Sequence, residues 1–89
     1  MKIKENFVLQ EVADDFIVVP VGKEADRFHG VFNLNETGAF LWKYLSEKEC
    51  DADILVNFLV ESFSVNFMVA QNDVKIFIQK LQDFGCLEG

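Results

Sequence analysis

The stretch FNLNETG, residues 32–38, decides the fold, because it predicts a β-strand that runs directly into a helix. Phe32 and Leu34 are apolar residues two positions apart, which is the period of a strand with one buried face. Asn35 is a favoured helix N-cap, and the acidic residue after it suits the first turn of a helix. The rest of the chain divides around this junction, with strands before it and helices after it.

Three segments in the first third of the chain have the composition of strands, at about residues 7–12, 16–21 and 29–34. The middle segment is β-branched and apolar on both faces, and Pro20 fits only near the end of a strand or at an edge. Because sequential strands are usually neighbours, we expect this segment at the centre of a three-stranded antiparallel sheet. The other two are then edge strands, and residues 22–26 are expected to form a charged loop.

Three helices are predicted after the junction, at about residues 35–46, 51–63 and 66–84. Asn66 is a candidate N-cap of the third helix, and Gly85 is a natural residue to end it. Each helix carries an apolar stripe at helical spacing, which predicts its buried face. The three stripes are Gly38, Leu41, Trp42 and Leu45; Ile54, Leu55, Phe58 and Leu59; and Ala70, Val74, Phe77, Ile78 and Leu81. Residues 1–89 are therefore expected to form one α+β domain.

The last edge strand is the first candidate binding surface. An edge strand carries unpaired N–H and C=O groups, and adding a peptide strand to such an edge is a recurrent mode of recognition. Residues 30–34 carry no charged side chain that would blunt the edge. The alternative is an edge covered by a helix or blunted by Arg27 and His29.

The third helix offers a second wall for such a site. At about 100° per residue, Val69, Asp73, Ile76 and Lys80 form a mixed strip beside the buried stripe, and Phe77 lies between the two. If this strip faces the exposed strand, the strand and the helix form a groove that offers backbone pairing and side-chain pockets. The alternative is that the apolar members of the strip are ordinary scattered surface residues.

Charge and composition exclude several classes of protein. A formal net charge of −7 disfavours binding to nucleic acid and to anionic membranes. No segment approaches the ~18 apolar residues that span a bilayer, and no signal-peptide core follows the first lysines. A soluble, cytoplasmic protein is expected, in which Cys50 and Cys86 are free thiols.

The residues of common catalytic and metal sites do not form a recognisable pattern. His29 is the single histidine, and no Cys or Ser motif surrounds it. Cys50 and Cys86 lack the spacing of a metal site, and no glycine-rich phosphate loop is present. Trp42 is expected in the core. We therefore expect no catalytic residue, no metal and no cofactor.

Residues 32–38 resemble the signature of the coenzyme PQQ synthesis protein D (PqqD-like) family, in which an aromatic-x-Leu-Asn strand end leads into a Glu-Thr-Gly/Ala helix start. Ala39 and Trp42 occupy the small-residue and Trp positions of the helix that follows. Residues 73–87 match the closing pattern of the family, so that the resemblance runs from about residue 7 to residue 88. The sequence departs from the pattern at residues 50–51 and 67–69.

The resemblance implies a winged-helix-like fold with a three-stranded sheet and a three-helix bundle. It also implies a recognition element for ribosomally made, post-translationally modified peptides, named after PQQ biosynthesis. In that family the leader of a precursor peptide adds as a strand to the third strand, beside the third helix, and is presented to a modifying enzyme, often a radical SAM protein. Carried over to this chain, the expected peptide-binding residues are Gly30, Val31, Phe32, Asn33 and Leu34 on the strand, with Val69, Asp73, Ile76, Phe77 and Lys80 on the helix.

Two other functions compete with peptide recognition. A winged-helix DNA-binding domain would need a basic recognition helix, whereas the third helix balances Lys75 and Lys80 against Asp73 and Asp83. A structural or oligomerisation module would instead pair its edge strand with a second copy and form a homodimer. This second alternative stays open on the sequence.

Overall fold

The larger sheet of the molecule has three antiparallel strands. The computed structural model describes residues 1–27 and 30–88. The strands are β2 (Phe7–Val12), β3 (Asp15–Pro20) and β4 (Phe32–Leu34), and they lie in the order β2-β3-β4. The central position of β3 and the two edges agree with the arrangement predicted from the sequence. Pro20 is the last residue of β3, where its missing N–H disturbs the ladder least.

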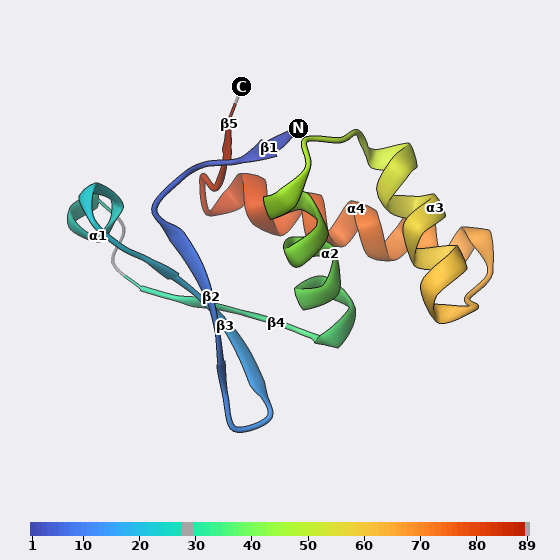
Figure 1. Cartoon of the computed structure of the whole chain (residues 1–89), viewed down its shortest axis with the longest axis horizontal. Coiled ribbons are helices and arrows are strands. Elements are labelled where there is room, and N and C mark those ends of the chain that lie inside the picture. Colours follow the sequence, from blue (N-terminus) through green and yellow to red (C-terminus); the bar gives the residue numbers. More distant parts are fainter. Residues whose placement is uncertain (28–29, 89) are drawn as a thin grey trace.

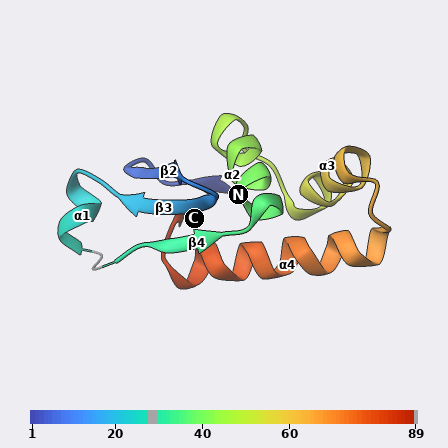
Figure 2. The ribbon, with the colours of Figure 1, turned by 90° about the horizontal axis from the view of Figure 1, so that it is seen from below.

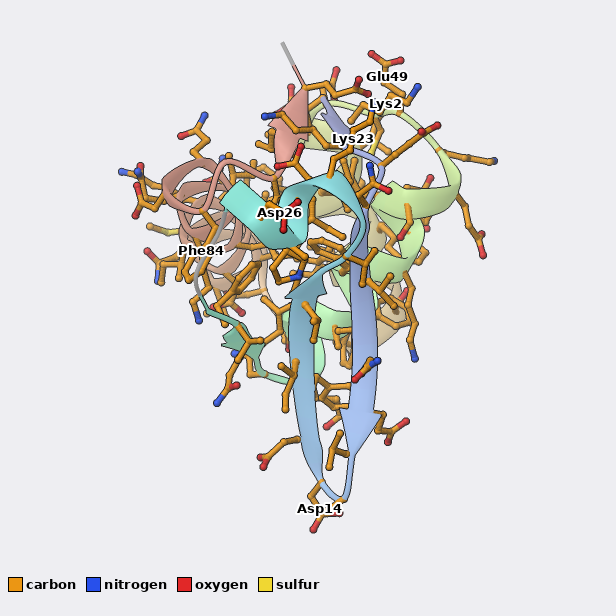
Figure 3. All side chains as sticks on the ribbon, turned by 90° about the vertical axis from the view of Figure 1, so that its left-hand side faces the viewer. Lys2, Asp14, Lys23, Asp26, Glu49 and Phe84 are labelled. Atoms are coloured by element: carbon orange, nitrogen blue, oxygen red, sulfur yellow. The ribbon has the colours of Figure 1, made fainter. Side chains whose placement is uncertain are left out.

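The β2–β3 hairpin extends away from the helices, and Figure 3 shows Asp14 at its tip. Ala13, the first residue of the turn, has a positive φ of 55°. Positive φ at a hairpin turn matches the right-handed twist of the flanking strands. The hairpin therefore closes in a tight turn, and the strand order leaves β2 and β4 as the two edges of the sheet.

Two expectations for the segment between β3 and β4 are wrong. Residues 22–26, expected as a charged loop, contain most of a short helix, α1 (Lys23–Arg27). The last strand begins at Phe32, later than expected, because Gly30 has a φ of 141° that side chains rarely adopt and that interrupts the extended pattern. Phe28 and His29, which the sequence places in this strand or just before it, lie outside the described residues.

Three longer helices follow the sheet: α2 (Glu36–Glu47), α3 (Ala52–Phe63) and α4 (Phe67–Asp83). The described residues thus contain four helices, one more than the sequence predicts. Each long helix begins after a side chain that accepts a hydrogen bond from the backbone N–H three residues on. The pairs are Asn35 with Gly38 at 2.7 Å, Asp51 with Ile54 at 3.0 Å, and Asn66 with Val69 at 2.9 Å.

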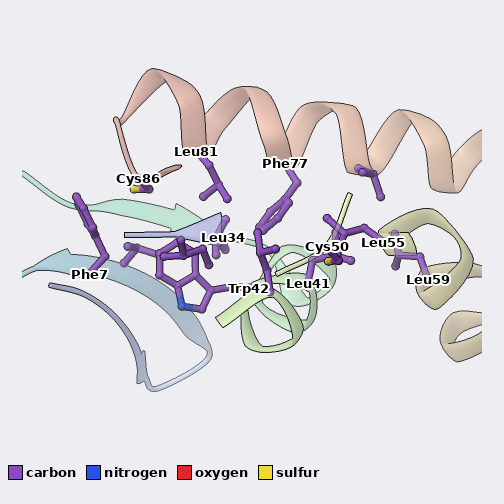
Figure 4. Packing of buried hydrophobic residues seen from close by; sticks show 14 of the residues in the cluster. Phe7, Leu34, Leu41, Trp42, Cys50, Leu55, Leu59, Phe77, Leu81 and Cys86 are labelled. Atoms are coloured by element: carbon purple, nitrogen blue, oxygen red, sulfur yellow. The ribbon is translucent and has the colours of Figure 1, made fainter. Parts of the chain in front are cut away.

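One hydrophobic core connects the sheet with the three long helices (Figure 4). Leu34, Trp42 and Phe77 gather between β4, α2 and α4 in this view. Its largest fully buried side chains are Val18, Leu41, Leu45, Leu55, Leu59, Val74, Leu81 and Cys86. The core is therefore built mainly from the apolar stripes that the sequence predicts.

The buried face of α3 differs from the face that the sequence predicts. Ile54 is 43% exposed, and Val56 is buried instead. Phe58 is only half-buried, and it stacks on Phe40 of α2 with ring centroids 4.7 Å apart. Ile78 of α4 is also half-buried. The buried face of α3 is thus rotated by about one residue from the predicted face.

A second, two-stranded sheet joins the two ends of the described chain (Figure 1). It pairs β1 (Lys2–Ile3) with β5 (Leu87–Glu88) in antiparallel register. Ile3 is buried in the core, and the Lys4 N–H donates to the Cys86 carbonyl at 2.7 Å. The sequence does not predict this sheet, because strands of two residues show no period.

Over the described residues, none of the helices combines the length and the apolar composition that crossing a membrane requires.

Candidate functional site

Helix α4 lies beside the open edge of the larger sheet. Figure 2 shows α4 running along β4 and then continuing past the sheet to α3. Near the end of the helix, the rings of Phe32 and Phe84 lie 4.3 Å apart, centroid to centroid. Further along β4, the Lys80 ammonium donates a hydrogen bond to the Asn33 carbonyl at 2.8 Å. The two elements therefore run in opposite directions and are held together at one end.

A groove of about 380 Å³ opens between β4, the start of α2 and α4. Most of the strand and helix residues expected to bind a peptide line it. Its lining consists of Asn33, Leu34, Asn35, Thr37, Gly38, Asp73, Ile76, Phe77 and Lys80.

Asn33 presents its backbone to the open side of the sheet. In an antiparallel ladder each residue directs its N–H and C=O to the same side, and the side alternates from one residue to the next. The Asn33 carbonyl faces away from β3, because it accepts its hydrogen bond from Lys80 of α4. The N–H of Asn33 therefore faces the open edge as well. Phe32 and Leu34 turn their backbone toward β3 and bury their side chains.

The helix wall of the groove combines apolar surface with two opposite charges. Ile76 is 58% exposed and is the apolar side chain that an occupant of the groove would contact, whereas Phe77 is buried behind it. Asp73 is half-buried and Lys80 is exposed. Asp73 and Lys80 are seven positions apart in sequence, which is about 10 Å along a helix. They form no salt bridge with each other.

Four of the expected site residues lie outside this groove. Val69 belongs to a separate concavity near the start of α4, together with the exposed Phe67 and Met68. Gly30 and Val31 are exposed residues before β4. Phe32 is a core residue with 6% of its surface exposed.

Three groove residues were not expected from the sequence: Asn35, Thr37 and Gly38. The sequence predicts for them only the start of a helix. Their position directly after the edge strand predicts that they lie close to the groove, because a few residues cannot carry the chain far from the end of β4. A Cβ at Gly38 would lie 3.2 Å from Leu34 Cδ2, so that the glycine lets α2 begin close against β4.

The larger concavity on the other side of α4 lacks an open strand edge. It has a volume of about 620 Å³ and lies between α3 and α4, against Val56, Met68 and Ile78. Both of its walls are helices, whose backbone groups are paired along each helix except in the first and last turns. The groove beside β4 therefore presents the outward-facing N–H and C=O of an edge strand, and this concavity does not.

Both cysteines are free thiols that belong to the hydrophobic core. In the part of the chain that the structure describes, no three His, Cys, Asp or Glu side chains converge as a metal site would require. Burial raises the pKa of both thiols, that of Cys86 to about 11. A thiol that stays protonated is a poor nucleophile.

Comparison with solved structures finds the same fold in two leader-peptide complexes. One, TbiB1 in complex with the TbiA(beta) leader peptide, is 22% identical, with a TM-score of 0.75 over 100% of this chain and 96% of that chain. The other, a lasso peptide synthetase B1 complexed with the leader peptide, is 17% identical, with a TM-score of 0.72 over 99% and 96%. None of the curated proteins matches the sequence.

Comparison with protein families gives one assignment. The family described as coenzyme PQQ synthesis protein D (PqqD) matches residues 8–87, which include all three strands of the larger sheet almost completely and all four helices. This match covers the junction at residues 32–38 and the closing segment of the chain. The chain therefore belongs to the PqqD family.

Proposed function

We propose that this chain is a non-catalytic recognition module that binds the leader of a ribosomally made precursor peptide. The observation that carries the proposal is the outward-facing backbone of Asn33 beside a groove with an exposed Ile76 on its opposite wall. The family membership and the two leader-peptide complexes of the same fold support it.

Binding follows from the geometry of the edge. The leader adds to β4 as a fourth strand, and its backbone pairs with the N–H and C=O of Asn33. An apolar side chain of the leader rests on Ile76 and covers it from water. Burial of one aliphatic side chain contributes roughly 1.5–3 kcal/mol, and a micromolar complex corresponds to about −8 kcal/mol.

The module acts in the cytoplasm, where ribosomal precursors are made, and presents the leader to a modifying enzyme. A radical SAM protein is the partner that the family resemblance suggests. The module itself needs no cofactor, because its contribution is to bind and orient the peptide.

The test is to measure leader binding by Ile76→Asp, with Ile54→Asp as the matched control. Both isoleucines are exposed helix residues, but only Ile76 lines the groove. The ligand is a synthetic leader, taken from any short precursor that is found encoded beside the gene, and titration calorimetry measures its affinity. We expect Ile76→Asp to weaken binding about tenfold or more, which is 1.4 kcal/mol, and Ile54→Asp to leave the affinity unchanged.

Changes in the NMR chemical shifts of the backbone amides, measured as the leader is added, locate the bound peptide. We expect the largest shifts at Asn33 and Leu34. Binding that survives Ile76→Asp with shifts that avoid β4 would exclude the groove. A stable dimer that buries β4 in sedimentation experiments would instead favour pairing between two copies of the chain.

A further inference from the structure

Lys80 occupies the backbone acceptor that an added strand needs. Its ammonium donates to the outward-facing carbonyl of Asn33 at 2.8 Å, across 47 positions of sequence. None of the described carboxylates forms a salt bridge with Lys80. The contact is exposed, so that water can replace it at little cost. Lys80 thus covers the edge of the empty groove without being fixed there.

An added strand competes with this contact, because a peptide N–H approaches the same carbonyl from the same open side. The displaced ammonium stays at the groove wall, since α4 holds the Lys80 backbone beside β4. The bound peptide removes water from its surroundings, which strengthens any charge pair that it forms. A carboxylate is the peptide group that best satisfies a cation in this position.

The spacing along α4 specifies where that carboxylate lies relative to the apolar contact. Lys80 and Ile76 are four residues apart, which is about 6 Å along the helix. Side chains on one face of a strand are two residues apart, which is about 6.8 Å. A peptide strand therefore matches both helix side chains when its acidic and apolar residues are separated by one residue.

We propose that Lys80 is the charge-reading residue of the groove. It covers the Asn33 carbonyl when the groove is empty, and on binding it selects a peptide with an acidic side chain two residues from the side chain that rests on Ile76. This inference rests on the proposed function and adds the chemistry of the peptide. One acidic residue in a neutral or basic peptide is favoured over an acidic peptide, because the protein carries a net charge of −7.

The experiment selects a displayed library of random 12-residue peptides on three proteins: the native chain, Lys80→Glu and Lys75→Glu. Lys75 is the matched control, because it is also an exposed lysine of α4 but does not line the groove. Each substitution lowers the net charge by two, so that general electrostatic effects are the same.

The native protein and Lys75→Glu should both enrich Asp or Glu two positions from an apolar residue. Lys80→Glu should enrich Lys or Arg at that position instead. For a synthetic peptide from the native selection, changing the acidic residue to Lys should weaken native binding about threefold to fivefold and strengthen binding to Lys80→Glu.

Two negative outcomes are distinguishable. In the first, the selected peptides change the NMR chemical shift of the Asn33 amide, but they show no preference for an acidic residue, or Lys80→Glu selects the same acidic residue as the native chain. Lys80 then does not recognise charge, and the proposed function stands. If no selected peptide shifts the Asn33 amide, strand addition to β4 itself is excluded.

Discussion

Cys86 is the residue whose chemistry depends most directly on the fold. It is fully buried, precedes β5, and belongs to the same hydrophobic core as Ile3 and Leu81. Desolvation by burial is the main reason that its thiol pKa rises from 9.0 to about 11. Lys4 opposes this shift to a smaller extent.

This raised pKa predicts a loss of stability at high pH. The folded state holds the Cys86 proton more tightly than the unfolded state does. The stability associated with the protonated thiol is therefore complete below pH 9 and is lost as the pH rises toward 11. Two pH units correspond to up to about 2.7 kcal/mol. Urea unfolding of the native chain and of Cys86→Ala at several pH values measures how much of the pH dependence comes from Cys86. Equal pH slopes for the two proteins would contradict the burial argument.

Single residues could be predicted where their role is local. Asn35 and Asn66 cap helices as the sequence indicates, because a cap depends only on the next three residues. The Lys80 contact with Asn33 could not be predicted, because it depends on how two distant elements pack. Ile54 shows the same limit, since helical spacing gives a stripe but not the exact rotation of the helix against its neighbours.

At the scale of elements, length decides what the sequence can predict. The long helices and the strands of residues 7–12 and 15–20 have enough residues to show a period. Two-residue β1 and β5 and the five-residue α1 do not. In β4 the alternation of Phe32 and Leu34 is real, but the positive φ of Gly30 limits the strand to three residues.

The orientation of β4 gives a test of strand addition that is separate from side-chain contacts. Asn33→Pro removes the outward-facing N–H but none of the hydrogen bonds between β3 and β4, and proline is tolerated at sheet edges. We expect this variant to remain folded by circular dichroism and to lose leader binding in calorimetry. Asn33→Ala, which keeps the N–H, should bind as the native chain does. Unchanged binding by Asn33→Pro would show that the peptide does not pair with this residue.

For the whole molecule, the sequence predicts which strand and which helix form the walls of the groove, but it does not predict how far the two walls overlap. Ala70, Val74, Phe77 and Leu81 face the core and so fix the rotation of α4. That rotation turns Asp73, Ile76 and Lys80 toward β4. The helix has 17 residues, about 25 Å, whereas β4 has three, about 10 Å. Val69 therefore lies past the sheet, which the helical wheel alone cannot show.

The small β1–β5 sheet predicts that stability depends on residues far from the main sheet. Ile3→Ala removes a buried side chain and should lower the free energy of unfolding by about 2–5 kcal/mol. Lys2→Ala removes only the exposed salt bridge with Glu88, whose N–O distance is 3.7 Å, and should cost less than about 1 kcal/mol. Urea unfolding measures both. Equal effects would mean that Ile3 contributes little to the core.

The two adjacent faces of α4 have a consequence for how this module can diverge. Ala70, Val74 and Leu81 maintain the fold, whereas Ile76 and Lys80 are exposed and lie on a different side of the same helix. Substitutions at exposed positions usually change stability by less than about 0.5 kcal/mol. If the groove binds a leader as proposed, exchange of two or three such side chains should change which peptide the domain prefers while its folding is left intact.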